Sequence, residues 1–272
     1  MQEWAIISST AEEHVLYQIA NAPMREYPYA HIYVENVFPE DFYAGLRKNW
    51  PTAESLFCIG DSGRVAKGAY PERFILPVTQ AEIQKLDADR RAFWLEFGSW
   101  LLSLRFMNAM IEKFEPYVRD RFGDAMVNNY YGAESLVVQD LTNYSIGPHT
   151  DSPHRLLSML FYCPDDDSRS HLGTSIYIPN DPELRCAGGP HYLHHRFRKV
   201  KTMEYRRNSL FAFIKNDRSF HGVEPIGEQP VGRDVLLYDV RVEQSEAAAE
   251  VTPTAVSRLG AKILKRLIRS RN

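Results

Sequence analysis

The stretch SLVVQDLTNYSIGPHTDSPHRLLSMLFYC (residues 135–163) is where the chain changes from helical to extended patterning. Its two ends are short segments rich in β-branched and aromatic residues, separated by Gly, Pro, Asp and Asn. Similar segments follow, and the six strand candidates are 135–144, 156–163, 173–180, 199–205, 209–214 and 233–242. Because no helical pattern lies between them, these segments predict an antiparallel sandwich or barrel.

The chain before residue 135 is mainly helical in pattern. A capping-box pattern that starts at Thr10 predicts a helix over 10–21, and 28–51 predicts a short strand followed by a helix. Residues 52–80 are rich in Gly, Pro and charge, so we expect an irregular segment there. In 87–114 apolar residues recur at helical spacing, which predicts a single helix packed along the outside of the sheet.

Composition excludes several classes of protein. With 272 residues, of which 44% are hydrophobic and 25% charged, the chain has the balance of a soluble globular protein with a substantial core. The net charge of −3 gives no basic field, so we expect no nucleic-acid partner. Three well-separated cysteines, no signal-peptide pattern and no apolar run long enough to span a membrane predict a cytoplasmic location.

Polar residues with metal-binding chemistry lie between and after the strand candidates. His149 and Asp151 are two residues apart, so on an extended chain their side chains point the same way and can bind one ion. His221, just after a later strand, can supply a third ligand and complete the facial triad typical of non-haem Fe(II). Arg233 opens the last strand, where its guanidinium can bind a carboxylate. The alternative is a coincidence of turn residues and a barrel salt bridge.

In their order along the chain, these residues resemble a known family. Tyr144, the His149-Thr-Asp151 triplet, SFHGVEP around His221 and the pair Gly232-Arg233 are similar to the Fe(II)- and 2-oxoglutarate-dependent dioxygenases, in particular the prolyl-4-hydroxylase-like branch. The resemblance covers about 135–242 and, more loosely, HIYVENVFPEDFYAGL near the N-terminus. It implies an α+β fold with a mainly β core, a double-stranded β-helix (a jelly-roll or cupin-like barrel), with the N-terminal helices outside the sheet.

The resemblance also implies roles for single residues. His149, Asp151 and His221 would be the catalytic iron ligands. Arg233 would bind the distal carboxylate of 2-oxoglutarate, and Tyr144 would assist it with a hydrogen bond.

One position departs from the family pattern. Many relatives carry Ser or Thr two residues after the Arg, whereas this chain has Val235, so a second anchor for the distal carboxylate must come from elsewhere. The implied cofactors are Fe(II), the cosubstrate 2-oxoglutarate and O₂. The implied reaction is hydroxylation of a substrate with release of succinate and CO₂.

The segment 185–201 bears on the substrate. It is basic and contains three histidines, and at the barrel mouth it would favour a polar or anionic small molecule, for example an acidic or nucleotide-linked sugar. Its alternatives are a plain solvated loop or a zinc site that includes Cys186. We expect His154 to be an exposed turn histidine, and Arg155 to be either a contact for an anionic substrate or a surface charge.

The end of the chain differs in composition from the rest. Residues 255–272 form a basic amphipathic helix candidate, which would be a solvated tail, a helix docked on its own domain, or a peripheral contact with the inner face of an anionic membrane. The last possibility keeps a lipid-linked sugar among the candidate substrates. The predicted organisation is one oxygenase domain over 1–243, helical over 1–134 and jelly-roll over 135–243, and then a linker and this helix over 244–272.

Two other functions fit the same residues. One is hydroxylation of a protein or peptide side chain, as in prolyl hydroxylases, and the other is a cupin-like metal-binding barrel without oxygenase activity. Nothing in the sequence specifies an oligomeric state.

Overall fold

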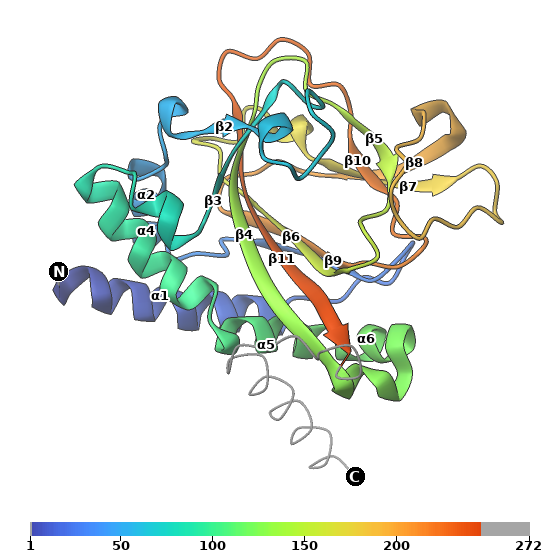
Figure 1. Cartoon of the computed structure of the whole chain (residues 1–272), viewed down its shortest axis with the longest axis horizontal. Coiled ribbons are helices and arrows are strands. Elements are labelled where there is room, and N and C mark those ends of the chain that lie inside the picture. The colour runs from blue at the N-terminus through green and yellow to red at the C-terminus, as the bar shows by residue number, and fades with distance from the viewer. Residues whose placement is uncertain (1, 246–272) are drawn as a thin grey trace.

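The computed structural model of the protein describes residues 2–245, and the structural statements below concern that part of the chain (Figure 1). The predicted basic helix over 255–272 and nearly all of its linker lie outside the described residues. Among the described helices, none is both long and apolar enough to cross a membrane.

Two antiparallel β-sheets form the centre of the molecule. The larger sheet has seven strands in the order β1-β9-β6-β11-β4-β3-β2, and the smaller has four in the order β5-β10-β7-β8. The strands are β1 (His31–Glu35), β2 (Phe57–Cys58), β3 (Arg73–Pro77), β4 (Asn129–Asp140), β5 (Ile146–His149), β6 (Arg155–Tyr162), β7 (Thr174–Pro179), β8 (Phe197–Met203), β9 (Ser209–Ile214), β10 (His221–Val223) and β11 (Arg233–Ser245).

The order of the last eight strands defines the fold. Along the chain, β4 lies in the large sheet, β5 in the small one, β6 in the large, β7 and β8 in the small, β9 in the large, β10 in the small and β11 in the large. This connectivity is that of a double-stranded β-helix, or jelly roll, in which two four-stranded sheets face each other. The fold expected from the resemblance is therefore confirmed.

Alternation along β11 explains why the large sheet can pack on both faces. Val235 and Leu237 lie on the inner face with the apolar lining between the sheets, whereas Leu236 and Tyr238 lie on the other face with the helices. Successive side chains of a strand point to opposite faces, so one apolar strand contributes to two cores.

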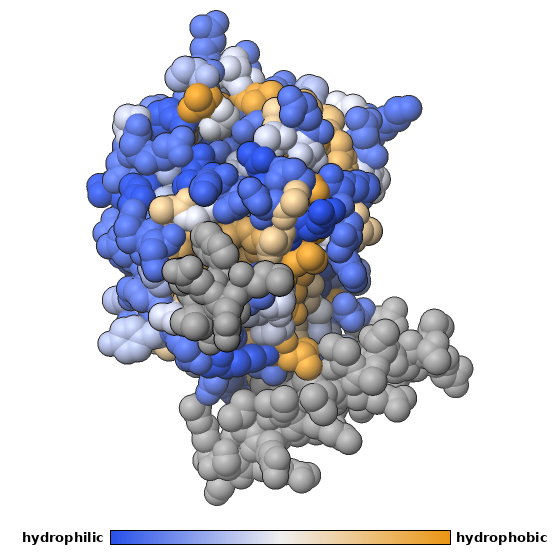
Figure 2. Space-filling view, turned by 90° about the vertical axis from the view of Figure 1, so that its left-hand side faces the viewer, coloured by the Kyte–Doolittle hydropathy of each residue, from blue (hydrophilic) through white to orange (hydrophobic). Residues whose placement is uncertain are grey.

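Helices cover the outer face of the large sheet, as the sequence predicted (Figure 1). They are α1 (Gln2–Asn21), α2 (Glu40–Lys48), α3 (Gln80–Ile83), α4 (Ala88–Leu101), α5 (Leu104–Lys113) and α6 (Glu115–Phe122). The ring of Phe106 in α5 meets that of Tyr238 in β11 with centroids 5.3 Å apart, and both rings are fully buried. The outer sides of the helices are polar, and the face in Figure 2 is largely hydrophilic.

Two helix predictions were wrong in their bounds. The helix expected over 10–21 begins at Gln2, so Thr10 lies inside α1 and does not cap it. The single helix expected over 87–114 is two helices, because Ser103 interrupts it: its Oγ accepts a hydrogen bond from the backbone N–H of Phe106 and caps α5.

The N-terminal region also contains strands that extend the large sheet. The segment 52–80, predicted to be irregular, contains β2 and β3, and β3 pairs with β4 in a register that places Arg73 opposite Asp140. Strand β1 pairs with β9 on the opposite edge. The region 1–134 is therefore not wholly helical, and the addition of β3 brings a charged side chain to the inner face of the barrel.

Candidate metal centre

The short strands β5 and β10 place the two histidines beside each other. They pair with His149 opposite His221, and the two imidazole centroids are 4.4 Å apart. The chain turns before β5, where the backbone N–H of Tyr144 donates to the carbonyl of Leu141. Strand β4 therefore ends at Asp140, not at Tyr144, and Gly147-Pro148 lies within β5.

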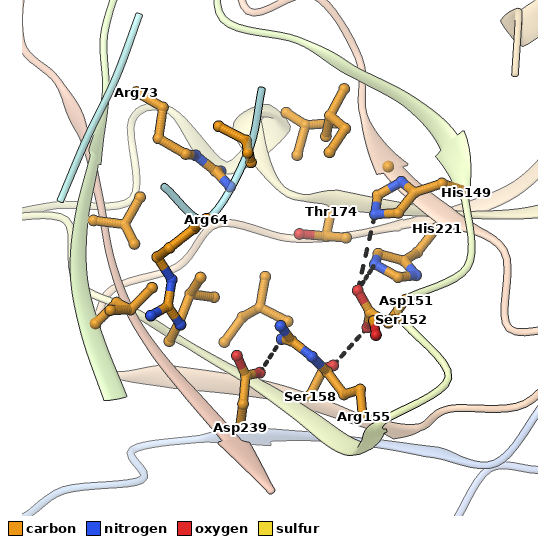
Figure 3. Close-up of a pocket in the computed structure, with 18 of the residues that line it drawn as sticks. Arg64, Arg73, His149, Asp151, Ser152, Arg155, Ser158, Thr174, His221 and Asp239 are labelled. Carbon is orange, nitrogen blue, oxygen red and sulfur yellow. Dashed lines mark hydrogen bonds and ion pairs between the residues drawn. The ribbon is translucent and has the colours of Figure 1, made fainter. Parts of the chain in front are cut away.

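Asp151 completes a three-residue cluster with the histidines (Figure 3). Its Oδ1 is 4.0 Å from Nε2 of His149 and 3.8 Å from Nε2 of His221. One ion placed between these atoms reaches all three ligands on one of its sides, which leaves its other positions free. The three residues singled out from the sequence thus lie together at the pocket wall.

Hydrogen bonds orient both rings toward Asp151. Nδ1 of His149 lies 2.9 Å from the carbonyl oxygen of Gly147, and Nδ1 of His221 lies 3.0 Å from that of Ser219. A carbonyl oxygen only accepts, so the proton of each neutral ring is on Nδ1. The lone pair of Nε2 is then free on the side where a metal ion would bind.

The protonation states suit a divalent cation. Burial, together with the neighbouring His221, lowers the pKa of His149 to about 3, so this ring is neutral at physiological pH. Burial by itself would raise the pKa of Asp151, but His221 and Arg155 outweigh it and hold the pKa below its ordinary value. The Ser158 hydroxyl contributes by donating to Oδ2 of Asp151 at 2.6 Å. Imidazole nitrogens and a carboxylate are the donors that Fe(II) sites use.

The cluster opens into a pocket of about 470 Å³ between the two sheets. This volume is in the range of sites for small molecules. Much of the wall is aliphatic or aromatic, contributed by Leu136, Val138, Leu160, Phe213, Val235 and Leu237. Charged side chains gather at separate places around this apolar lining (Figure 3).

Arg233 lies in one of these charged groups and is only 1% exposed. Its Nη1 donates to Asp140 at 2.8 Å, its Nε to the carbonyl of Leu172 at 2.6 Å, and its Nη2 to Thr174 at 3.4 Å. Arg73 donates to the same carboxylate, through Nε at 2.6 Å and Nη2 at 3.0 Å. Two guanidinium groups share one carboxylate, so this end of the pocket has an excess of one positive charge.

Tyr144 adds an unsatisfied hydroxyl to the same end of the pocket. The side chain is fully buried, its ring lies under the Arg73 guanidinium at 4.2 Å, and its Oη has no hydrogen-bond partner within residues 2–245. Burial raises the pKa of Tyr144, so the hydroxyl stays protonated and can donate. A buried unsatisfied polar group costs about 1–3 kcal/mol, which an anionic ligand at this position would recover.

The residues present therefore fit 2-oxoglutarate as well as iron. The distal carboxylate would bind beside Arg233. Arg73 and Tyr144 can there supply the second anchor that Ser or Thr provides in many relatives and that Val235 cannot provide. Sequence reasoning missed Arg73 because its position depends on the pairing of β3 with β4. No local pattern in 52–80 signals that pairing.

The segment 185–201 covers part of the metal cluster. The ring of His191 lies 4.5 Å from that of His149, and the hydroxyl of Tyr70 contacts Nδ1 of His191 across the pocket mouth. In contrast, Arg198 of the same segment is exposed to solvent.

The zinc alternative for this segment finds no cluster in the described part of the chain, where the only group of three or more such ligands is the one around Asp151. Cys186 is buried. His154 is exposed, as expected.

Comparisons with known proteins give structural likeness only. No protein-family model matches the chain, and no curated protein sequence matches it. A prolyl 4-hydroxylase from Phytophthora capsici is 13% identical with a TM-score of 0.44, over 96% of this chain and 76% of that one. A Pseudomonas putida prolyl-4-hydroxylase is 12% identical with a TM-score of 0.45, over 86% and 99%.

HygX from Streptomyces hygroscopicus, solved with nickel and 2-oxoglutarate bound, is 13% identical with a TM-score of 0.42, over 78% of this chain and 83% of that one. Likeness at this level decides neither activity nor substrate. Both have to be argued from the residues of the pocket.

Proposed function

We propose that the protein is an Fe(II)- and 2-oxoglutarate-dependent oxygenase that hydroxylates a polar or anionic small molecule. One observation carries the proposal: a single pocket holds a His-Asp-His cluster and, apart from it, two guanidinium groups that share one carboxylate beside an unsatisfied hydroxyl. A metal ligand set and a separate anion site are what a chelating dicarboxylate cosubstrate requires.

Each part of the pocket has a separate task in this proposal. His149, Asp151 and His221 hold the metal on one side and leave the other side open to the cavity. Iron with bound 2-oxoglutarate and O₂ supplies the oxidising chemistry, which converts a C–H bond to C–OH and releases succinate and CO₂. The apolar lining keeps bulk water from the reacting groups.

The narrow entrance of the pocket favours a small molecule as the substrate and disfavours a protein chain. Tyr70 and His191 come from two different segments and meet above the cluster, which narrows the entrance. An extended polypeptide would have to displace this contact. Acidic, nucleotide-linked or lipid-linked sugars remain candidate substrates of the proposed enzyme.

Succinate release tests the proposal. The purified protein with Fe(II), 2-oxoglutarate and O₂ should produce succinate, more rapidly when a panel of small molecules includes the substrate. His149→Ala should abolish release, whereas His154→Ala, which changes an exposed histidine five residues away, should not. Metal binding without any 2-oxoglutarate turnover would instead favour the cupin-like barrel without oxygenase activity.

A further inference from the structure

A second charged group lies in the same pocket, farther along β11 from Arg233. Asp239 and Arg241 follow Arg233 on the same face of the strand at even spacing. At about 3.3 Å per residue, Asp239 is roughly 20 Å from Arg233 along the strand. The 2-oxoglutarate site proposed at Arg233 therefore does not account for this group.

Five side chains make up this group, which we call the outer cluster: Arg64, Glu134, Arg155, Asp239 and Arg241. Arg64 pairs with Glu134 at 2.6 Å, Arg241 pairs with the same carboxylate, and Arg155 pairs with Asp239. Three guanidinium groups thus face two carboxylates. Within these ion pairs the guanidinium groups outnumber the carboxylates by one.

Asp151 also lies near Arg155, but a bound metal ion would more than balance its charge. The excess positive charge of the outer cluster therefore remains when the metal site is filled.

The outer cluster also has buried polar atoms outside any hydrogen bond of the described structure: two donors, and the carboxylate oxygens Oε1 of Glu134 and Oδ1 of Asp239. The Nε–H groups of Arg155 and Arg241 are buried, and neither has a hydrogen-bond partner among the residues that the structure describes. A buried donor without a partner destabilises the folded protein, and an acceptor oxygen of a ligand would remove that cost. Burial raises the pKa of Asp239 to about 6 in spite of the Arg155 charge, and the neighbouring Asp151 and Glu134 carboxylates add to this rise.

We propose that the outer cluster binds a carboxylate group of the substrate, an inference that rests on the proposed oxygenase function. A carboxylate has one charge, which matches the excess, and two oxygens, which match the forked donors of a guanidinium. Arg155 and Asp151 lie on neighbouring parts of the pocket wall, so a substrate held there presents its adjacent carbon atoms to the metal cluster (Figure 3).

This site differs from the one that the sequence favoured. Arg198, Lys199 and Lys201 of the basic segment 185–201 are exposed to solvent and do not line the pocket. Of the two possibilities for Arg155, the position in the pocket wall favours contact with an anionic substrate. The preference for an anion thus rests on the outer cluster.

Binding of two fragment probes tests the inference without turnover. 4-Fluorobenzoate and 4-fluorobenzamide have nearly the same shape and differ in charge. Each is titrated, with fluorine NMR, into the full-length protein loaded anaerobically with Fe(II) and saturating 2-oxoglutarate, which occupies the Arg233 end. We expect the benzoate to bind at least fivefold more tightly than the benzamide.

Two variants test whether the preference for benzoate arises at the outer cluster. Arg64→Gln and Arg241→Gln each leave Glu134 with one guanidinium partner, so both proteins should fold, and each should reduce the benzoate preference to below twofold. Arg198→Gln makes the same change in net charge at an exposed position outside the pocket and should retain the preference. Equal binding of the two probes to the wild type, or an undiminished preference in both pocket variants, would overturn the inference.

The proposed function and the substrate site fail separately in these tests. If succinate release is never observed but benzoate binding still depends on Arg64 and Arg241, the outer cluster is an anion site and the oxygenase assignment is wrong. If succinate is released but benzoate has no advantage, the oxygenase assignment stands and its substrate does not bind through a carboxylate here.

Discussion

The two sheets of the barrel differ in the length of their strands, in what packs on them and in the site residues that they carry. In the large sheet, β4 has 12 residues and β11 has 13, and helices cover the outer face. In the small sheet, β5 has four residues and β10 has three, yet these two strands hold both histidines of the candidate metal centre. The large sheet provides most of the buried core, whereas the small sheet positions the two histidines of the candidate metal centre.

This comparison predicts that function and stability can be lost separately, beginning with function. His221→Ala removes one of three metal ligands, so we expect Fe(II) affinity to fall at least a hundredfold and succinate release to fall below detection. The far-UV circular dichroism spectrum should be unchanged. Retention of stoichiometric Fe(II) binding by this variant would show that the metal site has been misassigned.

The next largest effect should come from the large sheet. Phe106→Ala removes a fully buried ring that packs on Tyr238 between α5 and β11, and we expect the free energy of unfolding to fall by about 3–5 kcal/mol. Urea denaturation measures this loss. Fe(II) binding by the folded fraction should stay within about twofold of wild type, and a parallel loss of metal affinity would contradict the division between the sheets.

Arg73→Gln tests the contribution of β3 to the pocket. The change removes one of the two guanidinium groups that share Asp140 and leaves Arg233 paired with it. Loss of a charge-assisted contact should weaken 2-oxoglutarate about 10- to 100-fold while Fe(II) affinity stays the same. Competition or direct titration with 2-oxoglutarate provides the measurement, and an unaltered affinity would remove Arg73 from the site.

The smallest effect should come from Tyr144→Phe, which deletes only the unsatisfied buried hydroxyl. Because this hydroxyl has no partner in the described structure, its removal should leave stability unchanged or slightly higher. Affinity for 2-oxoglutarate should fall about 3- to 10-fold. A loss of stability without a change in affinity would indicate that the hydroxyl has a structural partner, not a ligand.

The same contrast explains what the sequence could predict. The long strands have enough apolar residues for a strand pattern to be recognised in the sequence. In β11, Val235 and Leu237 lie on one face of the sheet, and Leu236 and Tyr238 lie on the other. The strands β5 and β10 are too short to show an alternation of apolar and polar residues. In addition, β5 contains Gly147 and Pro148, a pair that is typical of turns.

Residues of the candidate site could be predicted from the sequence where they lie close together along the chain. The spacing of His149 and Asp151 is local, so the pair could be recognised from the sequence, together with later elements that match a known motif. The place of Arg73 depends on the β3–β4 register, and the outer cluster combines Arg64 with residues of β4, β6 and β11. These side chains are far apart in the sequence and come together only in the folded chain.

The most direct test of the proposed function is an anaerobic titration of 2-oxoglutarate into the Fe(II)-loaded protein, followed by visible absorption spectroscopy. Chelation of Fe(II) by the keto acid should give a new absorption band that saturates at one 2-oxoglutarate per chain. The band should be absent from Asp151→Ala and should require more 2-oxoglutarate in Arg73→Gln. Stoichiometric Fe(II) binding by the wild type with no such band at saturating 2-oxoglutarate would contradict the assignment.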